Sequence, residues 1–259
     1  MIAALAVAGF IWWKIPSEEK IRSCMTTTMF QVELCSTSKN YTPLSKMSKF
    51  IPRAIVATED GKFYQHQGFD WESIERNARD VMDSGRYKRG GSTISQQLAK
   101  NMFLYKEKSF YRKGIEALIT WKIENTLTKK EILEKYLNIV EFGKNIYGVK
   151  AASQFYFKKS PAAVNAAEAA FLAMLLPNPI KYSRSFHKKD LTPFAKKRVV
   201  NILKDLLMQG QISEDEYTAG ISQADDFFGV RPPPPTETQS DSIDDEENLN
   251  DGRDFVDDE

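Results

Sequence analysis

Residues 89–101 read RGGSTISQQLAKN, and two glycines stand ahead of hydroxyl residues that can start a helix. Thr93, followed three residues later by Gln96, fits a capping box. The glycines let the backbone approach a ligand closely, and the N–H groups and dipole of a helix start favour phosphate. Thr93, Gln97 and Lys100 recur at i, i+4 and i+7 and therefore share one face. The pattern predicts an anion-binding helix, whereas an ordinary capped surface helix leaves the glycines unexplained. The GK[ST] ending of a Walker A loop is absent, which excludes a P-loop ATPase.

A second stretch, TEDGKFYQHQG at residues 58–68, follows an apolar run and contains two adjacent carboxylates, Glu59 and Asp60. A carboxylate at the end of a buried element is partly desolvated, which raises its pKa toward the range of a general base. Glu59 is therefore the candidate base, and Asp60 would orient it or bind a cation. The alternative is a helix-terminal pair on the surface. His66 lies between aromatic residues and is interpreted as structural support for the Glu59 loop.

The stretch YRKGIEALITWKIE places Arg112 and Glu116 at i, i+4 spacing. Two interpretations remain open: an ion pair on a solvated helix face, worth a few tenths of a kcal/mol, or a phosphate-binding arginine with a second carboxylate across a cleft from Glu59. Just upstream, residues 102–111 mix apolar and aromatic side chains with lysines. That composition suits a surface that enters the lipid headgroup region or grips a lipid tail.

Hydrophobic periodicity predicts a mostly helical body with little sheet. The apolar residues recur at helical spacing from Phe50 onward, and Gly210 is expected to end one helix. FQVEL at residues 30–34 is the one short strand predicted. The predicted helices span residues 71–82, 92–104, 110–126, 129–140, 147–157, 161–176, 194–209 and 213–219.

Charge is unevenly distributed along the chain. The net charge is +1, but residues 233–259 contain eleven acids and one arginine, which gives −10 there and +11 over the first 232 residues. A basic body suits an anionic partner such as phosphate, nucleic acid or a membrane surface. The tail follows a run of prolines and has too few apolar groups to offset the entropy of ordering, so it is predicted to be disordered.

The N-terminus and the two cysteines indicate where in the cell the protein is located. The apolar run over residues 1–13 is shorter than the ~20 residues of a full span. We interpret it as the distal part of a transmembrane anchor whose true start lies upstream, with a buried helix or membrane-surface segment as the alternative. Cys24 and Cys35 have no nearby histidine, so a metal site is not expected. They would form a bridge in an extracytoplasmic protein, or remain two free buried thiols.

Four motifs now stand in order: EDGKFYQHQG, GGSTISQQLAKN, RKGIE and KKEILEKYLN, followed by EFGKNIYGVKAASQFYFKK. Together they resemble the signatures of the peptidoglycan glycosyltransferases, glycosyltransferase family fifty-one. The resemblance covers about residues 45–210 and is nearest to the monofunctional biosynthetic transglycosylases, since no transpeptidase domain follows. This chain departs from the family in its two-cysteine insert before Thr42, its short N-terminal span and its acidic tail.

The resemblance implies a lysozyme-like helical fold in two lobes, one facing the membrane, and polymerisation of lipid II into glycan strands with release of undecaprenyl pyrophosphate. Glu59 would be the general base on the acceptor sugar's 4-hydroxyl. Lys100 and Arg112 would stabilise the departing pyrophosphate, and Glu116 would organise the donor's phosphates. The residues expected to shape the cleft and bind substrate are Asp60, Phe63, His66, Gly90, Thr93 and Gln97.

The same resemblance requires no cofactor but leaves room for a divalent cation, Mg²⁺ or Mn²⁺. The expected partners are lipid II, the growing glycan strand and the membrane, with a contact to other cell-wall synthesis proteins left open and no nucleic acid. The enzyme would be a single-pass protein of the inner membrane with its catalytic domain in the periplasm. The expected organisation is an anchor (1–16), a juxtamembrane segment (17–44), the glycosyltransferase domain (45–222) and the disordered tail (223–259).

Two rival functions follow from the same residues. A lytic enzyme of this fold class would cleave glycan, and it needs an acid of raised pKa but no pyrophosphate site. Lys100 and Arg112 therefore favour synthesis. A non-catalytic, membrane-anchored wall scaffold is the second rival, against which the intact Glu59 and Glu116 argue.

Overall fold

The computed structural model describes residues 15–85, 91–106 and 109–229. The N-terminal part holds α2 (Glu18–Arg22), β1 (Met25–Thr26), β2 (Glu33–Leu34), the 3₁₀ turn Leu44–Lys46 and α3 (Phe50–Glu59). The central part holds α4 (Trp71–Ser84), α5 (Ile94–Phe103), α6 (Phe110–Thr126), α7 (Lys129–Ile139), β3 (Glu141–Gly143), β4 (Ile146–Tyr147) and α8 (Gly148–Phe157). The C-terminal part holds the 3₁₀ turn Pro161–Ala163, α9 (Ala166–Leu175), α10 (Pro179–Tyr182), α11 (Arg184–His187), α12 (Pro193–Met208) and α13 (Glu214–Asp225).

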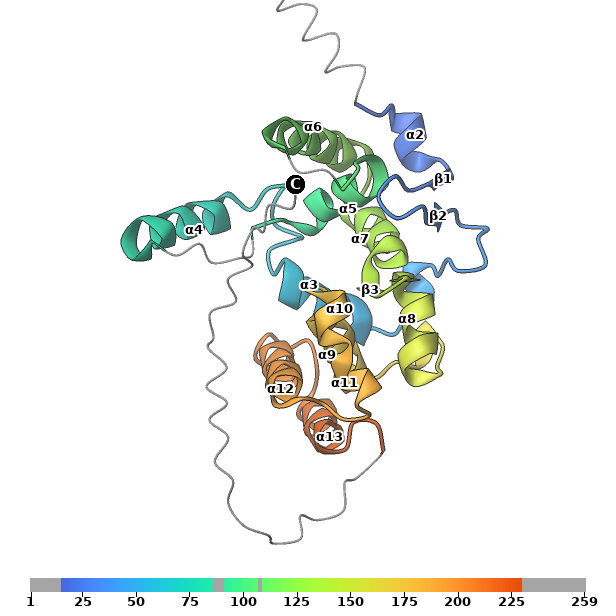
Figure 1. Cartoon of the computed structure of the whole chain (residues 1–259), viewed down its shortest axis with the longest axis vertical. Coiled ribbons are helices and arrows are strands. Elements are labelled where there is room, and N and C mark those ends of the chain that lie inside the picture. Colours follow the sequence, from blue (N-terminus) through green and yellow to red (C-terminus); the bar gives the residue numbers. More distant parts are fainter. Residues whose placement is uncertain (1–14, 86–90, 107–108, 230–259) are drawn as a thin grey trace, which may run out of the picture.

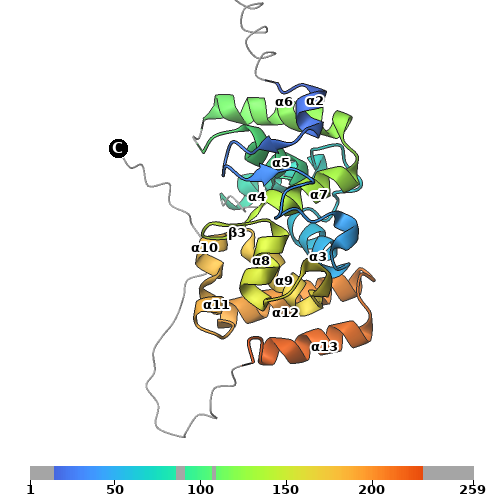
Figure 2. The ribbon, with the colours of Figure 1, turned by 90° about the vertical axis from the view of Figure 1, so that its right-hand side faces the viewer.

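The helices form two groups on either side of α3. In Figures 1 and 2, α2, α5, α6 and α7 lie toward one end, and α9, α12 and α13 lie toward the other. Every residue of α9 is buried, as expected for a helix that is apolar all round, and α3 and α12 pack against it. The predicted class, a mainly helical lysozyme-like domain, is confirmed. The last turn of α3 is thereby held between the two groups, which is where Glu59 lies.

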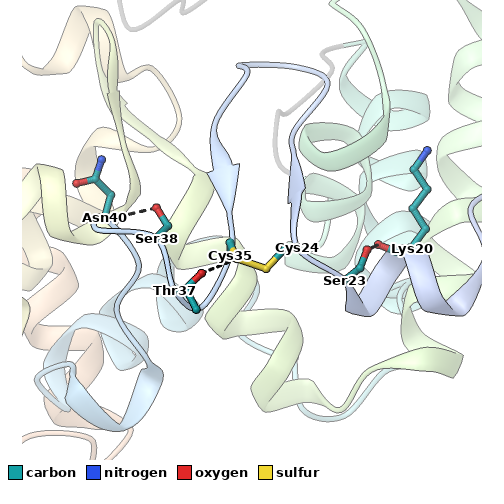
Figure 3. Close-up of a disulfide and its surroundings, with 7 residues drawn as sticks. All are labelled: Lys20, Ser23, Cys24, Cys35, Thr37, Ser38 and Asn40. Atoms are coloured by element: carbon teal, nitrogen blue, oxygen red, sulfur yellow. Dashed lines mark hydrogen bonds between the residues drawn. A yellow bond between two sulfur atoms is a disulfide. The ribbon is translucent and has the colours of Figure 1, made fainter.

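The two strands β1 and β2 form an antiparallel hairpin joined by the predicted disulfide. Cys24 and Cys35 are bonded, with their Cα atoms 4.4 Å apart, and the Cys35 sulfur lies 3.0 Å from the Thr37 hydroxyl. Figure 3 shows the bridge closing the base of the hairpin. Both cysteines are bridged, so the alternative of two free thiols is wrong.

The predicted helix over residues 161–176 is wrong in its first part. Pro161–Ala163 form a 3₁₀ turn, and α9 begins only after Asn165. The Asn165 backbone is extended, and its side chain forms a reciprocal capping box with Glu168. An alanine-rich sequence hid this boundary, because alanine fits both segments. The structure also adds the β3–β4 pair and the short helices α2, α10 and α11, which were not predicted.

The folded body is larger than the predicted domain at both ends. The segment 17–44 packs onto it, since Ile21 and Leu34 are fully buried or nearly so. At the other end α13 runs to Asp225, and the Phe227 ring is buried against Phe171, with centroids 5.2 Å apart. Residues 223–229 thus belong to the body and not to a tail, and the remainder of the predicted tail lies outside the described residues.

No helix within residues 15–85, 91–106 and 109–229 is long and apolar enough to cross a membrane. The predicted anchor, residues 1–16, lies almost wholly outside that range.

Candidate active site

The candidate base Glu59 is the last residue of α3. Its helix is fixed because Ile51, Ala54 and Ile55 are fully buried in the core. The Glu59 side chain is half-buried, and Gln97 Nε2 donates to its Oε2 at 2.9 Å. Burial raises the pKa of Glu59 above the usual carboxyl range, against the opposing Gln97 hydrogen bond and the positive charges of Arg198 and Lys100. The desolvated carboxylate predicted from the sequence is therefore present.

Asp60, the next residue, connects the loop after α3 to the start of α5. It is 7% exposed, and its Oδ2 accepts from the backbone N–H of Ile94 at 3.0 Å. Its Oδ1 lies 2.9 Å from His66 Nε2. Because the Gly68 N–H donates to His66 Nδ1 at 3.1 Å, the ring proton is on Nε2 and is donated to Asp60. These contacts are those expected of a residue that supports the Glu59 loop, and Asp60, with both oxygens in use, connects this loop to α5.

The start of α5 is bound to the Glu59 loop. Thr93 donates its hydroxyl to the Gly68 carbonyl at 2.6 Å and forms the predicted capping box with Gln96. Gly68 has φ of +90°, and a Cβ there would meet Thr120 Cγ2 at 3.0 Å, so glycine is required by conformation and by space. The Ile94 N–H at this helix start is used by the protein's own carboxylate, Asp60. Gly90, predicted to cradle phosphate, lies outside the described residues.

The cationic side chains gather farther along α5, where it faces α6. A cavity of about 140 Å³ lies between the two helices, lined by Ser92, Gln96, Gln97, Lys100, Arg112, Lys113 and Glu116. Three of these side chains are cations and one is a carboxylate. Burial lowers the pKa of Lys100, against the attraction of Glu116, while Arg112 and Lys113 lower it further. Such a cavity favours a ligand with more than one negative charge.

Arg112 and Glu116 differ from a solvated ion pair in two ways. Glu116 is 3% exposed and pairs with Lys113 Nζ at 2.5 Å, so the interpretation as a pair on a solvated face is wrong. Arg112 Nε is buried and has no hydrogen-bond partner within the described part of the chain. A buried guanidinium donor without a partner, beside a polar cavity, is the feature expected of a site that is completed by an anionic ligand.

A larger hollow of about 670 Å³ borders the other side of the His66 loop, between α4 and α6. It is lined by Lys62, Gln65, His66, Gln67, Phe69, Asp70, Trp71, Glu72 and Trp121, and therefore includes neither Glu59 nor Lys100. The candidate site is nevertheless the smaller cavity, because the cations line it and Gln97, which hydrogen-bonds the candidate base, lines it too. Phe63, also predicted to shape the cleft, is fully buried with Lys129 Nζ 4.6 Å from its ring centroid, so it supports the loop from the core.

Comparisons with known proteins identify the family of this chain. The sequence profile of the family described as transglycosylase matches residues 26–206. The chain belongs to the transglycosylase family. It is 44% identical over 179 residues to a biosynthetic peptidoglycan transglycosylase of Acinetobacter baylyi, covering 67% of this chain and 77% of the relative. Proteins of the same name from Acinetobacter baumannii (40% over 198 residues; 74% and 84% covered) and Dechloromonas aromatica (41% over 177; 68% and 77%) are also similar. The predicted family and enzyme class, a peptidoglycan glycosyltransferase, are confirmed.

The profile of the transglycosylase family begins at residue 26, well before the resemblance assigned from the motifs. Part of the cysteine segment therefore lies inside the family match. That agrees with the burial of Leu34 and with the hydrogen bond from the Thr28 N–H to the Met102 carbonyl at the end of α5.

Three residues at or near the candidate site of this transglycosylase were not predicted from the sequence. The Tyr136 hydroxyl donates to Gln97 Oε1 at 2.9 Å. Tyr136 fell in the apolar stripe of the predicted helix 129–140, and the hydroxyl within that stripe was the available signal. Lys113 lines the cavity and follows Arg112 in the RKGIE motif. Arg198 acts on Glu59 from α12, and nothing in its local sequence marks it.

The carboxylates of this transglycosylase bear on whether it holds a cation. No group of three or more His, Cys, Asp or Glu side chains that could hold a metal occurs among the residues the structure describes. In the cavity Glu116 is the single carboxylate, and a Lys113 ammonium already pairs with it. These residues do not form a protein cage for Mg²⁺ or Mn²⁺, both of which prefer several oxygen ligands.

Proposed function

We propose that this enzyme polymerises lipid II into glycan strands and releases undecaprenyl pyrophosphate. Glu59 takes the proton from the 4-hydroxyl of the acceptor sugar. That oxygen attacks the anomeric carbon of the donor sugar, and the bond from this carbon to the pyrophosphate oxygen breaks with its electron pair. Lys100 and Arg112 bind the negative charge that develops on the leaving pyrophosphate, where preorganised cations are most effective.

The observation that carries the proposal is that one helix, α5, both contacts the candidate base on α3 and supplies a cation to the cavity. Gln97 hydrogen-bonds the candidate base, and Lys100, one turn later on α5, lines the cationic cavity. Three residues of α-helix rise by about 4.5 Å. A helix that contacts the base through Gln97 and lines the cationic cavity one turn later fits a reaction in which a hydroxyl proton and a phosphate leaving group are handled in the same step.

A glycan-cleaving activity would account for the base Glu59 but not for the cationic cavity between α5 and α6. Hydrolysis of a glycosidic bond needs a proton donor for a sugar oxygen and has no phosphate leaving group. Glu116 already pairs with Lys113, so the partly buried Lys100 and Arg112 would then lack an anionic ligand, and a partly buried charge without a partner is costly. The cavity and the unpartnered Arg112 Nε therefore support synthesis.

For cofactors, we propose that none is required. Glu116 would face the donor's phosphates together with the Lys113 ammonium that it binds. A divalent cation would need most of its ligands from substrate and water, since the cavity offers one carboxylate.

We propose that the enzyme acts on the periplasmic side of the inner membrane, on lipid-anchored substrate and the growing strand. The Cys24–Cys35 disulfide supports an oxidising compartment. Aromatic side chains around the start of α6 support contact with lipid: Phe110 is 100% exposed, and Tyr105 and Tyr111 are also exposed. The test is sedimentation with anionic vesicles. Phe110→Ser should weaken binding, whereas Met208→Ser, at the exposed end of α12, should not; equal binding by both variants would refute this lipid-facing surface.

The function itself is tested by incubating the enzyme with labelled lipid II and, separately, with finished peptidoglycan. We expect long glycan products from lipid II and no release of fragments from finished peptidoglycan. Fragments from the second substrate, with lipid II untouched, would establish the lytic alternative. Loss of activity on both would favour the scaffold.

A further inference from the structure

Gln97 stands between two groups that constrain the direction of its amide. Its Nε2 lies 2.9 Å from Glu59 Oε2, and its Oε1 lies 2.9 Å from the Tyr136 hydroxyl. An ionised carboxylate can only accept hydrogen bonds, whereas an amide donates at one end and accepts at the other. The functioning base therefore needs the nitrogen end of Gln97 to face it.

The Tyr136 hydroxyl prevents the reverse orientation. Tyr136 is fully buried on α7, and Gln97 Oε1 is the acceptor that its hydroxyl has within the described residues. If the amide turned over, its nitrogen would face Tyr136, and the hydroxyl proton would lose its acceptor in the core, which is costly. Burial, together with the negative charges of Glu59 and Asp60, raises the pKa of Tyr136 well above its usual value, so it remains a donor at all working pH values.

The two oxygens of Glu59 are thereby made unequal. Oε2 accepts from Gln97, while no hydrogen bond to Oε1 occurs among the residues described. The other charged groups that act on the carboxylate are Arg198 from α12, Lys100 from α5 and the adjacent Asp60. None of these groups donates a hydrogen bond to Oε1 within the described part of the chain, so this oxygen can accept a hydrogen bond from a substrate hydroxyl.

We propose that Tyr136 is a positioning residue: by fixing the Gln97 amide it commits Glu59 Oε2 to Gln97 and selects Oε1 as the oxygen that takes the acceptor's proton. The inference rests on the proposed role of Glu59 as the base. Without the Tyr136 hydroxyl, Gln97 can present its oxygen to Glu59. That contact repels the carboxylate and favours the protonated acid, which cannot act as a base.

The test is the pH dependence of lipid II polymerisation by Tyr136→Phe. We expect the acid limb of kcat to move up by about one pH unit, which is a roughly tenfold loss of rate on the acid side, with KM little changed. Tyr156→Phe is the matched control, because Tyr156 is also buried and donates to a backbone carbonyl, that of Phe142, at 2.7 Å. Tyr156→Phe should lose comparable thermal stability and keep the wild-type pH profile.

Two further variants separate the possible outcomes. Gln97→Met should move the limb in the same direction as Tyr136→Phe, and adding Tyr136→Phe to it should cause no additional shift; this measurement also serves if Tyr136→Phe does not fold. Identical pH profiles for wild type, Tyr136→Phe and Gln97→Met would overturn the positioning role. Glu59→Gln separates the role of the base from the role of Tyr136. Near-normal turnover by Glu59→Gln would overturn Glu59 as the base. An inactive Glu59→Gln, together with an unshifted pH profile for Tyr136→Phe, would overturn only the inference about Tyr136.

Discussion

Replacing Asp60 by asparagine should disable the connection between the Glu59 loop and α5. Asp60 accepts from two donors, the Ile94 N–H and the His66 Nε2–H. Asparagine keeps one acceptor oxygen and turns the other position into an N–H₂ donor, which would face one of them. His66 cannot relieve the conflict by moving its proton, because the Gly68 N–H already occupies Nδ1. One buried donor is therefore left without an acceptor.

The size of the effect follows from these contacts. A hydrogen bond to a charged group contributes about 1.5–3 kcal/mol, and a buried unsatisfied donor costs about 1–3 kcal/mol. These two contributions overlap, because both arise in part from the same broken hydrogen bond. We therefore expect the free energy of unfolding to fall by about 3 kcal/mol in total. For a domain of this size that corresponds to a decrease in Tm of roughly 6–12 °C. Activity should fall as well, because Gln97 and Lys100 depend on the position of α5.

The assay is thermal unfolding followed by lipid II turnover, with Asp70→Asn as the control. Asp70 is also an acceptor at a helix start, capping α4 through the Ser73 N–H, but it is half-buried and asparagine is an equally good N-cap. Asp70→Asn should change the free energy of unfolding by less than about 0.5 kcal/mol. If Asp60→Asn unfolds at the same temperature as Asp70→Asn and retains activity, the anchoring role of Asp60 is refuted.

The remaining predictions concern charge, covalent structure and pH. Lys100→Ala and Arg112→Ala should each lower kcat by about 10²-fold, as expected when a group that stabilises developing charge is removed; steady-state kinetics with unchanged rates for both would exclude their role on the leaving group. Replacing Cys24 and Cys35 together by serine should lower the free energy of unfolding by about 3 kcal/mol, the chain-entropy value for an eleven-residue separation, measured by denaturant unfolding; no change would show that hairpin packing alone holds this segment. Since a base must be deprotonated, activity should fall as the pH drops through the raised pKa of Glu59, above the usual carboxyl range, and a rate profile flat down to the ordinary carboxyl range would contradict the burial argument.

Local patterns in the sequence predicted most helices because each carries its own start signal and periodicity. Thr93 with Gln96 and Thr128 with Glu131 form reciprocal capping boxes, and helices start where these pairs stand. The pattern failed over 161–176, where alanine and proline allow both a 3₁₀ turn and a helix. Strand β2 (Glu33–Leu34) falls inside the strand predicted over residues 30–34, but β1, β3 and β4 were missed because strands of two or three residues carry almost no periodicity.

The candidate site was predictable where chemistry is local and unpredictable where it depends on tertiary packing. Glu59 was found because it ends an apolar run, and its raised pKa follows from that burial. The Asp60 contact with Ile94 joins residues 34 positions apart, and the Tyr136 contact with Gln97 joins residues 39 apart. No spacing rule connects such pairs, and the approach of Arg198 to Glu59 depends on how α12 packs against α3.

The central claim is that Glu59 is the general base for glycan polymerisation, and one variant tests it most directly. In the fold the pKa of Glu59 lies above its unfolded value, so the folded state binds more protons and the ionised side chain weakens the fold at neutral pH. Glu59→Gln removes that penalty and keeps an oxygen for Gln97. Turnover of labelled lipid II by this variant should therefore fall by ~10²–10⁴-fold while Tm at pH 7 stays equal or rises. Near-normal glycan synthesis by a folded Glu59→Gln enzyme would contradict the account.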